Sequence, residues 1–304
     1  MPGFFIGQYP FVVTRSIYAP CYCGAMGTSN LSTSNLMNSA INRFFRMPSG
    51  RYWEIDTWRG IVVITMIIFH LMWDLVNFHV SDAILYAGFW KYFQRFTACS
   101  FVFLAGVSLA IVYQRKPEFS RYLKRGLYVF GCGMLFSLAV LFFNIGYVHF
   151  GVLHMIGVSS ILAYPLLRYK WLNVFLWFIF YIIGGIFLLP EQVTWWLRGV
   201  NPLRLLNMSI MVDHPWLVWL GITPPRYYPV DFFPLFPYFG LVLLGVAVGN
   251  MVYSKNGRAF SLPDLSELAP IRFLRFLGSH SLPIYMIHQP VLFVILILLG
   301  IARL

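Results

Sequence analysis

Long apolar stretches separated by short polar connections dominate the chain after its first fifty residues. Each stretch is near the ~20 residues that a helix needs to cross a bilayer. Seven such stretches can be read, over residues 57–78, 96–113, 123–143, 149–167, 171–189, 232–253 and 281–302. The pattern predicts an all-α fold, a polytopic membrane helical bundle with about seven transmembrane helices.

The first of these stretches carries nearly all of its polar groups on one side. At about 100° per residue, His70, Asp74 and Asn77 fall within roughly 60° of Arg59. The rest of the circumference, Thr65 excepted, is apolar. One side of this helix is therefore expected to face lipid and the other a polar interior. A charged group in mid-membrane costs roughly 2.5–3.5 kcal/mol on the insertion scale, so such groups normally have a function or a partner.

The composition supports a membrane protein. Hydrophobic residues make up 59% of the chain and charged residues 11%, and the mean hydropathy is +0.72. Soluble domains carry about 25% charged residues. The net charge of +12 is better explained by positively charged cytoplasmic loops than by nucleic acid, which we do not expect as a partner.

Two segments differ from the rest. Residues 1–50 are predicted to be a poorly structured N-terminal tail, followed by a membrane domain over residues 51–304. The tail holds Cys21 and Cys23, a lone C-x-C that is weak as a metal or redox motif. Residues 190–231, rich in Pro, Trp and Arg, form a long loop that either covers a site or is an irregular connector.

The distribution of positive charge predicts the orientation. With a cytoplasmic N-terminus, sixteen of the twenty-two Lys and Arg residues lie in cytoplasmic segments and six in outer segments. This asymmetry favours a cytoplasmic N-terminus, an outer C-terminus and an outer loop over 190–231.

The His70 and Asp74 pair is the leading candidate for chemistry. His70 lies eleven residues beyond Arg59, or about 16 Å along the helix, which places it near the middle of the bilayer. Asp74 is one turn further and is expected to reach the imidazole, fixing its tautomer and raising its basicity. The pair suits a general base with its orienting carboxylate. A structural hydrogen bond between helices is the alternative.

Further polar groups lie on the fourth and seventh stretches. His154 is expected one to two turns from the outer face, while Tyr285, His288 and the adjacent Gln289 lie in the segment SLPIYMIHQPV. For each histidine, a buried hydrogen-bonded core position is an equal alternative; together with His70 they predict a polar chamber. A metal site built from His70, Asp74, His154 and His288 is an alternative, but the sequence has no dense ligand spacing of the H-x-x-x-H kind, so we expect no metal.

Five blocks in order resemble the heparan-α-glucosaminide N-acetyltransferase-like transmembrane acyltransferase family, in its short prokaryotic form. These blocks are RYWEIDTWRGIVVITMIIFHLMWDL at 51–75, FVFLAGVSLAI at 101–111, GVLHMIG at 151–157, DFFPLFPYFGLVLLGVAVG at 231–249 and LGSHSLPIYMIHQPV at 277–291.

This resemblance implies a membrane enzyme that takes acetyl from cytosolic acetyl-CoA and passes it to a sugar amine or hydroxyl across the membrane. Related acyltransferases that O-acetylate glycans carry an Arg and a His on their first span, which correspond to Arg59 and His70. The eukaryotic enzyme has its catalytic histidine just after that span, where His79 is the nearest counterpart. Arg59 is expected either to bind a phosphate or to pair with Asp56, and the cations at 115–125 to attract the donor.

The expected partners are membrane lipid and a glycan or lipid-linked sugar, in the plasma or inner membrane; a homo-oligomer is left open. Two other functions remain open from the sequence. A proton-coupled transporter or flippase would use the same His and Asp pair as a relay, although no inverted repeat is visible. A membrane subunit without catalytic activity would use the polar side of the first helix to dock a partner.

Overall fold

The computed structural model describes residues 51–85, 87–184, 215–221, 229–254 and 257–301. The predicted tail, its two cysteines and most of the 190–231 loop lie outside the described residues. All described residues belong to one compact unit, Met47–Leu304.

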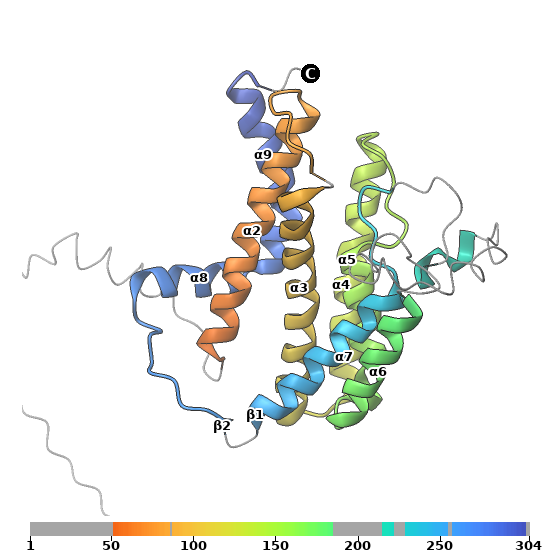
Figure 1. Cartoon of the computed structure of the whole chain (residues 1–304), viewed down its shortest axis with the longest axis vertical. Helices are drawn as coiled ribbons and strands as arrows, with labels where there is room; N and C mark the ends of the chain where they lie inside the picture. The colour runs from red at the N-terminus through yellow and green to blue at the C-terminus, as the bar shows by residue number, and fades with distance from the viewer. Residues whose placement is uncertain (1–50, 86, 185–214, 222–228, 255–256, 302–304) are drawn as a thin grey trace, which may run out of the picture. The chain divides into compact units, whose positions relative to one another are not determined.

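The described chain is mostly helical (Figure 1), which confirms the all-α part of the predicted fold class. Its elements are α2 (Trp53–Asn77), α3 (Gly88–Arg115), α4 (Phe119–Phe142), α5 (Val152–Leu162), the 3-10 turn η1 (Tyr164–Leu166), α6 (Trp171–Ile183), the 3-10 turn η4 (Pro215–Leu220), α7 (Leu235–Val252), the hairpin β1 (Tyr253–Ser254) and β2 (Gly257–Arg258), α8 (Ala269–Ser279) and α9 (Ser281–Leu298). Of the described helices, α2, α3, α4, α7 and α9 are long and apolar enough to cross a membrane. The other two predicted spans coincide with the shorter apolar helices α5 and α6.

The fourth predicted span, 149–167, is longer than the α-helix observed, because residues 149–151 are not helical and the chain passes into the 3-10 turn η1 after Leu162. The segments before α5 and before α7 run side by side, with Val230 N–H donating to the Tyr147 carbonyl at 3.1 Å and Phe233 N–H to the Phe150 carbonyl at 2.9 Å. His154 at the start of α5 packs against Gly133, about 14 Å from the Phe142 end of α4. Non-helical backbone at such depth requires internal hydrogen-bond partners, and these two segments supply them to each other.

Close helix crossings depend on glycine. Gly245 of α7 packs on the Phe103 carbonyl of α3, and Gly249 packs on Ala110. The G-x-x-x-G formed by these two glycines in the sixth predicted span is therefore a packing face.

Helix α8 was not predicted. It lies across the first half of α2 (Figure 1), where Gly278 meets the Asp56 carbonyl and Gly60 meets the Leu274 carbonyl with no room for a Cβ atom. This crossing fixes the start of α9 beside α2.

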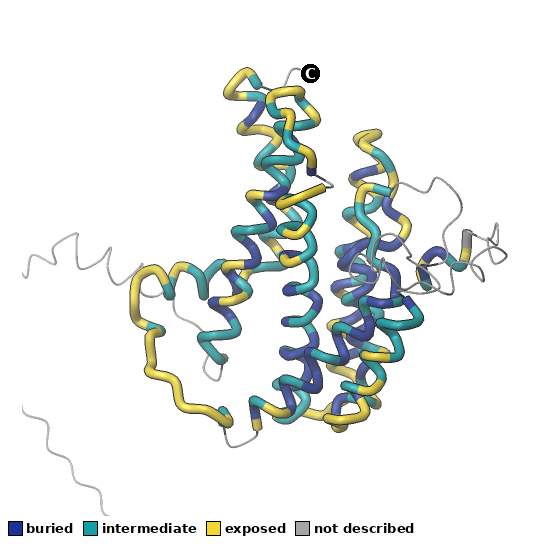
Figure 2. Tube along the Cα trace, viewed as in Figure 1, coloured by how far each residue is buried: buried dark blue, intermediate teal, exposed yellow. Residues whose placement is uncertain are grey.

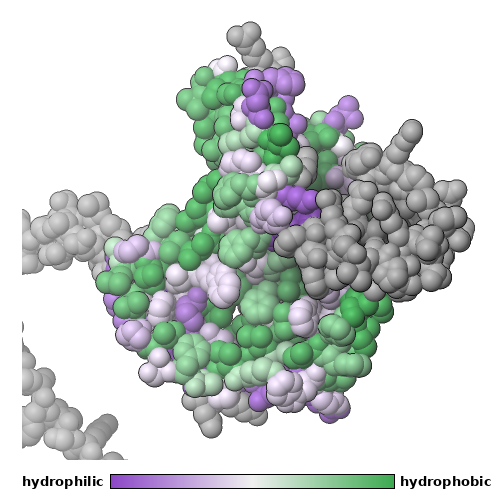
Figure 3. Space-filling view, in the orientation of Figure 1, coloured by the Kyte–Doolittle hydropathy of each residue, from purple (hydrophilic) through white to green (hydrophobic). Residues whose placement is uncertain are grey.

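Burial differs strongly among the long helices. In the most apolar 18-residue window of each helix, 61% of the window is buried in α7, but only 22% in α4 and 11% in α9. Figure 2 shows the residues of α9 as mostly intermediate and exposed. Hydrophobic residues cover most of the described surface on the face seen in Figure 3. Exposed apolar side chains such as Leu135, Leu138, Val291 and Val294 suit contact with lipid.

Candidate functional site

Two histidines meet where α2 packs against α9. The imidazole rings of His70 and His288 are 4.7 Å apart between centroids and nearly perpendicular, at 78°. His288 is 7% exposed, and His70 is partly buried. The structure thus brings together two of the three histidines that the sequence placed in a polar chamber.

The hydrogen bonds of both rings define the same tautomer. Nδ1 of His70 lies 2.9 Å from the Met66 carbonyl oxygen, and Nδ1 of His288 lies 2.7 Å from the Tyr285 carbonyl oxygen. A carbonyl oxygen only accepts, so Nδ1 must carry the proton in each ring and Nε2 is the basic nitrogen. Nε2 of His288 is buried and has no hydrogen-bond partner among the described residues.

Asp74 has a different partner from the one expected. Its Oδ1 accepts a 2.6 Å hydrogen bond from Nε2 of Gln289 on α9, while His70 is held by its own helix. Asp74 is 1% exposed, and its second oxygen and the Gln289 Oε1 are buried without partners in the described part of the chain. The predicted carboxylate–imidazole hydrogen bond is therefore replaced by a link between helices, because the tertiary contact with α9 offers Asp74 an amide donor.

Arg59 lies in a network of charges at the predicted inner end of α2. Its Nη1 is 3.0 Å from Asp56 Oδ1 and its Nη2 donates to Ser108 Oγ of α3 at 2.6 Å. Arg51 also pairs with Asp56, at 2.9 Å, and Arg125 is close enough to repel both Arg51 and Arg59. One carboxylate and three guanidinium groups thus lie in this region, which leaves an excess of positive charge suited to an anion.

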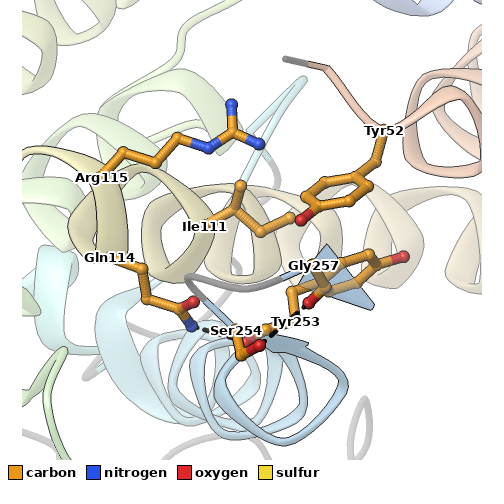
Figure 4. Close-up of a pocket in the computed structure, with 7 residues that line it drawn as sticks. All are labelled: Tyr52, Ile111, Gln114, Arg115, Tyr253, Ser254 and Gly257. Carbon is orange, nitrogen blue, oxygen red and sulfur yellow. Dashed lines mark hydrogen bonds between the residues drawn. The ribbon is translucent and has the colours of Figure 1, made fainter. Parts of the chain in front are cut away.

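A pocket of about 250 Å³ opens near the same end of the molecule (Figure 4). It is lined by Tyr52, Ile111, Gln114, Arg115, Tyr253, Ser254 and Gly257. The Arg115 guanidinium lies 5.4 Å and the Arg258 guanidinium 5.6 Å from the centre of the Tyr52 ring. Glu54 balances Arg258 at 2.8 Å. The pocket therefore combines an aromatic surface with positive charge.

Sequence reasoning missed Asp231, which follows Val230 in the segment beside α5. Its Oδ2 accepts the Val152 N–H at 3.0 Å and lies 3.5 Å from the Tyr285 hydroxyl. A Cβ on Gly151 would collide with this carboxylate. Burial raises the pKa of Asp231 to about 6. The available signal was a lone carboxylate within the apolar run PVDFFPLF.

His154 and His79 lie away from the histidine pair. His154 is 2% exposed, packs against the rings of Phe130 and Phe150 at 5.1 and 5.9 Å, and accepts the Gly151 N–H at Nδ1. Its tautomer is therefore opposite to that of the pair, with a buried proton on Nε2. His79 is exposed and has a φ of 58° just beyond the end of α2.

The described residues contain no group of three or more His, Cys, Asp or Glu side chains placed to hold a metal ion. The four residues His70, Asp74, His154 and His288 do not form one cluster, because Asp74 pairs with Gln289 and His154 packs between phenylalanines.

Comparison with known proteins adds a family. The sequence matches the model described as heparan-alpha-glucosaminide N-acetyltransferase, catalytic, over residues 51–290. The chain belongs to this family. No curated protein and no solved structure matches it. The resemblance seen in the sequence blocks is thus confirmed.

Membership in the heparan-alpha-glucosaminide N-acetyltransferase catalytic family implies acetyltransferase activity. The five long apolar helices indicate a multi-pass membrane protein. The matched range includes both the Arg59 network and the histidine pair. The family match therefore favours a membrane acetyltransferase over the transporter that the sequence left open.

Proposed function

We propose that this protein transfers acetyl from cytosolic acetyl-CoA to a sugar amine or hydroxyl, on a glycan or a lipid-linked sugar, at the outer side of the cell membrane. The observation that carries the proposal is the contact between His70 and His288 inside a bundle of the acetyltransferase family. Both rings keep a basic Nε2, which is the group that acyl transfer requires for a base or a nucleophile.

The donor enters from the predicted cytoplasmic end. Coenzyme A is a polyanion, and the pocket beside Arg115 and the network around Arg59 offer it positive charge at two depths. Ser108, which binds Arg59, lies seven residues before Arg115 on α3, or about 10 Å deeper. His70 lies a further ~16 Å along α2. An acetyl-CoA molecule extended along this line has its phosphates at the positively charged end and its thioester at the His70 imidazole.

The acceptor enters from the opposite side, along the segments that precede α5 and α7. Asp231 lies there beside the Tyr285 hydroxyl, and carboxylate and phenol groups are suited to hydrogen bonds with sugar hydroxyls and amines. We assign acceptor binding to this region and donor binding to the Arg59 side. His79 is assigned no step, because its side chain is exposed whereas His70 and His288 are in contact inside the bundle.

The test is an acetyl-transfer assay on the purified full-length protein. We expect acetyl-CoA to bind and free CoA to appear when cell-envelope glycans are added, and His70→Gln to abolish CoA release while acetyl-CoA still binds. Label retained on the protein without acceptor would indicate a transient acetyl-histidine, and its absence direct transfer. Absence of acetyl-CoA binding by the wild-type protein would contradict the proposal.

The orientation has its own test, in a variant whose native cysteines are replaced by serine. Asp82 and Glu118 are exposed in the connections that follow α2 and α3. In intact cells, a membrane-impermeant maleimide is expected to label Asp82→Cys, and to label Glu118→Cys only after permeabilisation. The reverse result would invert the orientation.

A further inference from the structure

The two imidazoles form one proton-binding unit. Each Nδ1–H is committed to a backbone carbonyl of its own helix, so each ring can take up a proton only at Nε2. With the rings in contact at 4.7 Å, a proton on one strongly disfavours a proton on the other. The pair therefore holds one proton at a time, on either of two neighbouring rings.

The two rings differ in the region to which their helix is connected. His288 bonds to the Tyr285 carbonyl, and the Tyr285 hydroxyl reaches Asp231 on the segment before α7. His70 shares α2 with Arg59. His288 is thus linked through Tyr285 to the region assigned to the acceptor, and His70 through α2 to the region assigned to the donor.

We propose that His288 is a catalytic residue, the base that takes the acceptor proton, and that His70 delivers this proton to the departing thiolate. This inference rests on the proposed function. The observation that points to His288 is its Nε2, a buried basic nitrogen that lacks a hydrogen-bond partner among the described residues. An acceptor O–H or N–H supplies the donor that this nitrogen lacks.

The reaction balances without another reactant. The acceptor oxygen or nitrogen attacks the thioester carbonyl carbon, and its proton moves to Nε2 of His288. The C–S bond breaks, the proton passes to Nε2 of His70, and the CoA sulfur takes it to leave as the thiol. Both rings return to their starting tautomer, ready for the next turnover.

The first test separates the two histidines with a small acceptor. Hydroxylamine is unprotonated and strongly nucleophilic near neutral pH, so it depends little on a base. We expect His288→Gln to lower kcat with envelope glycans by on the order of 10²–10⁴-fold, with an unchanged KM for acetyl-CoA, and to lose much less activity with hydroxylamine. His70→Gln is expected to lose activity with both acceptors.

The matched control is His280→Gln. His280 is an exposed histidine at the junction of α8 and α9, and its Nδ1 also bonds to a backbone carbonyl, that of Phe276. This variant should keep wild-type rates. An equal loss with glycans and hydroxylamine in His288→Gln, or a raised KM for acetyl-CoA, would overturn the inference by making His288 a structural or donor-binding residue.

A second measurement uses the wild-type protein and does not depend on the variants folding. The relay moves one proton from the acceptor to the thiolate, so kcat with envelope glycans is expected to fall in D₂O along a straight line against the mole fraction of D₂O; an unchanged kcat in D₂O would contradict the relay. An inactive wild-type protein would instead overturn the proposed function itself. An active wild type with an unimpaired His288→Gln variant would overturn only the role of His288.

Discussion

Asp74 of α2 and Gln289 of α9 are joined by a 2.6 Å hydrogen bond across 215 residues of sequence. Gln289 directly follows His288, and Asp74 lies one helical turn beyond His70. The bond therefore holds together the two helix segments that carry the imidazole pair. Its position suggests that it sets the spacing of the two rings.

Breaking this bond is expected to destabilise the protein. Asp74→Leu leaves the Gln289 amide unpaired in an apolar interface, which costs about 1–3 kcal/mol, whereas Asp74→Asn keeps an acceptor oxygen and should cost less. Thermal unfolding in detergent measures both. Adding Gln289→Leu to Asp74→Leu should recover part of the loss; strictly additive effects would show that the two side chains do not interact.

The α2–α8 crossing should not tolerate a methyl group. Gly278→Ala is expected to lower the unfolding temperature and the acetyl-transfer rate together, because its Cβ would collide with the Asp56 carbonyl and push α8 away from the start of α2. Gly131→Ala is the control, since a Cβ there meets nothing within 4 Å and alanine favours the helix by about 0.5–1 kcal/mol. Equal stability of the two variants would contradict this packing.

Arg59 should contribute mainly to donor binding. Arg59→Ala removes a charged group, and a hydrogen bond to such a group contributes about 1.5–3 kcal/mol. We therefore expect the affinity for acetyl-CoA to fall by about 10- to 100-fold. The fold should persist because Arg51 still pairs with Asp56. Arg168→Ala removes an equal charge from an exposed position and should leave affinity unchanged. Titration with acetyl-CoA measures the affinity of both variants. An equal loss of affinity in the two would contradict a role of Arg59 in donor binding and leave it only a determinant of membrane topology.

The raised pKa of Asp231 leads us to expect that the stability of the protein depends on pH. Its pKa in the folded protein, about 6, lies above the ordinary value of 3.8 because burial disfavours the charged form. The folded state therefore binds the proton more tightly than the unfolded state, and this stabilisation is lost as the pH rises through about 6. Asp231→Asn cannot titrate. Its unfolding temperature should fall less than that of the wild type between about pH 5 and pH 7; parallel curves would refute the raised pKa.

The sequence predicted the single-helix features well and the contacts between helices poorly. The polar side of α2 follows from helical geometry alone, and Arg59, His70 and Asp74 all find partners there on other helices. Which partner each one finds depends on tertiary packing. For this reason the sequence assigned Asp74 to His70, its neighbour on the helix, and missed the amide of Gln289.

Two misjudged segments have physical explanations. Apolarity alone does not distinguish a helix from extended backbone buried in protein, so the sequence overestimated the helix that begins at Val152. Helix α8 was missed because Arg272 and Arg275 keep its segment from reading as a membrane span, although its sequence is amphipathic. Asp231 gave too little signal alone, because its role depends on α5 and α9 meeting it.

The central claim is that an acetyl group passes from a cytosolic donor to an acceptor on the other side of the membrane through the His70 and His288 site. Sealed inside-out membrane vesicles with labelled acetyl-CoA in the outer medium test it most directly. We expect label to appear on glycan protected inside the vesicles with the wild-type protein, and not with His70→Gln. Label on externally exposed acceptor only, or equal internal label in the variant, would contradict the claim.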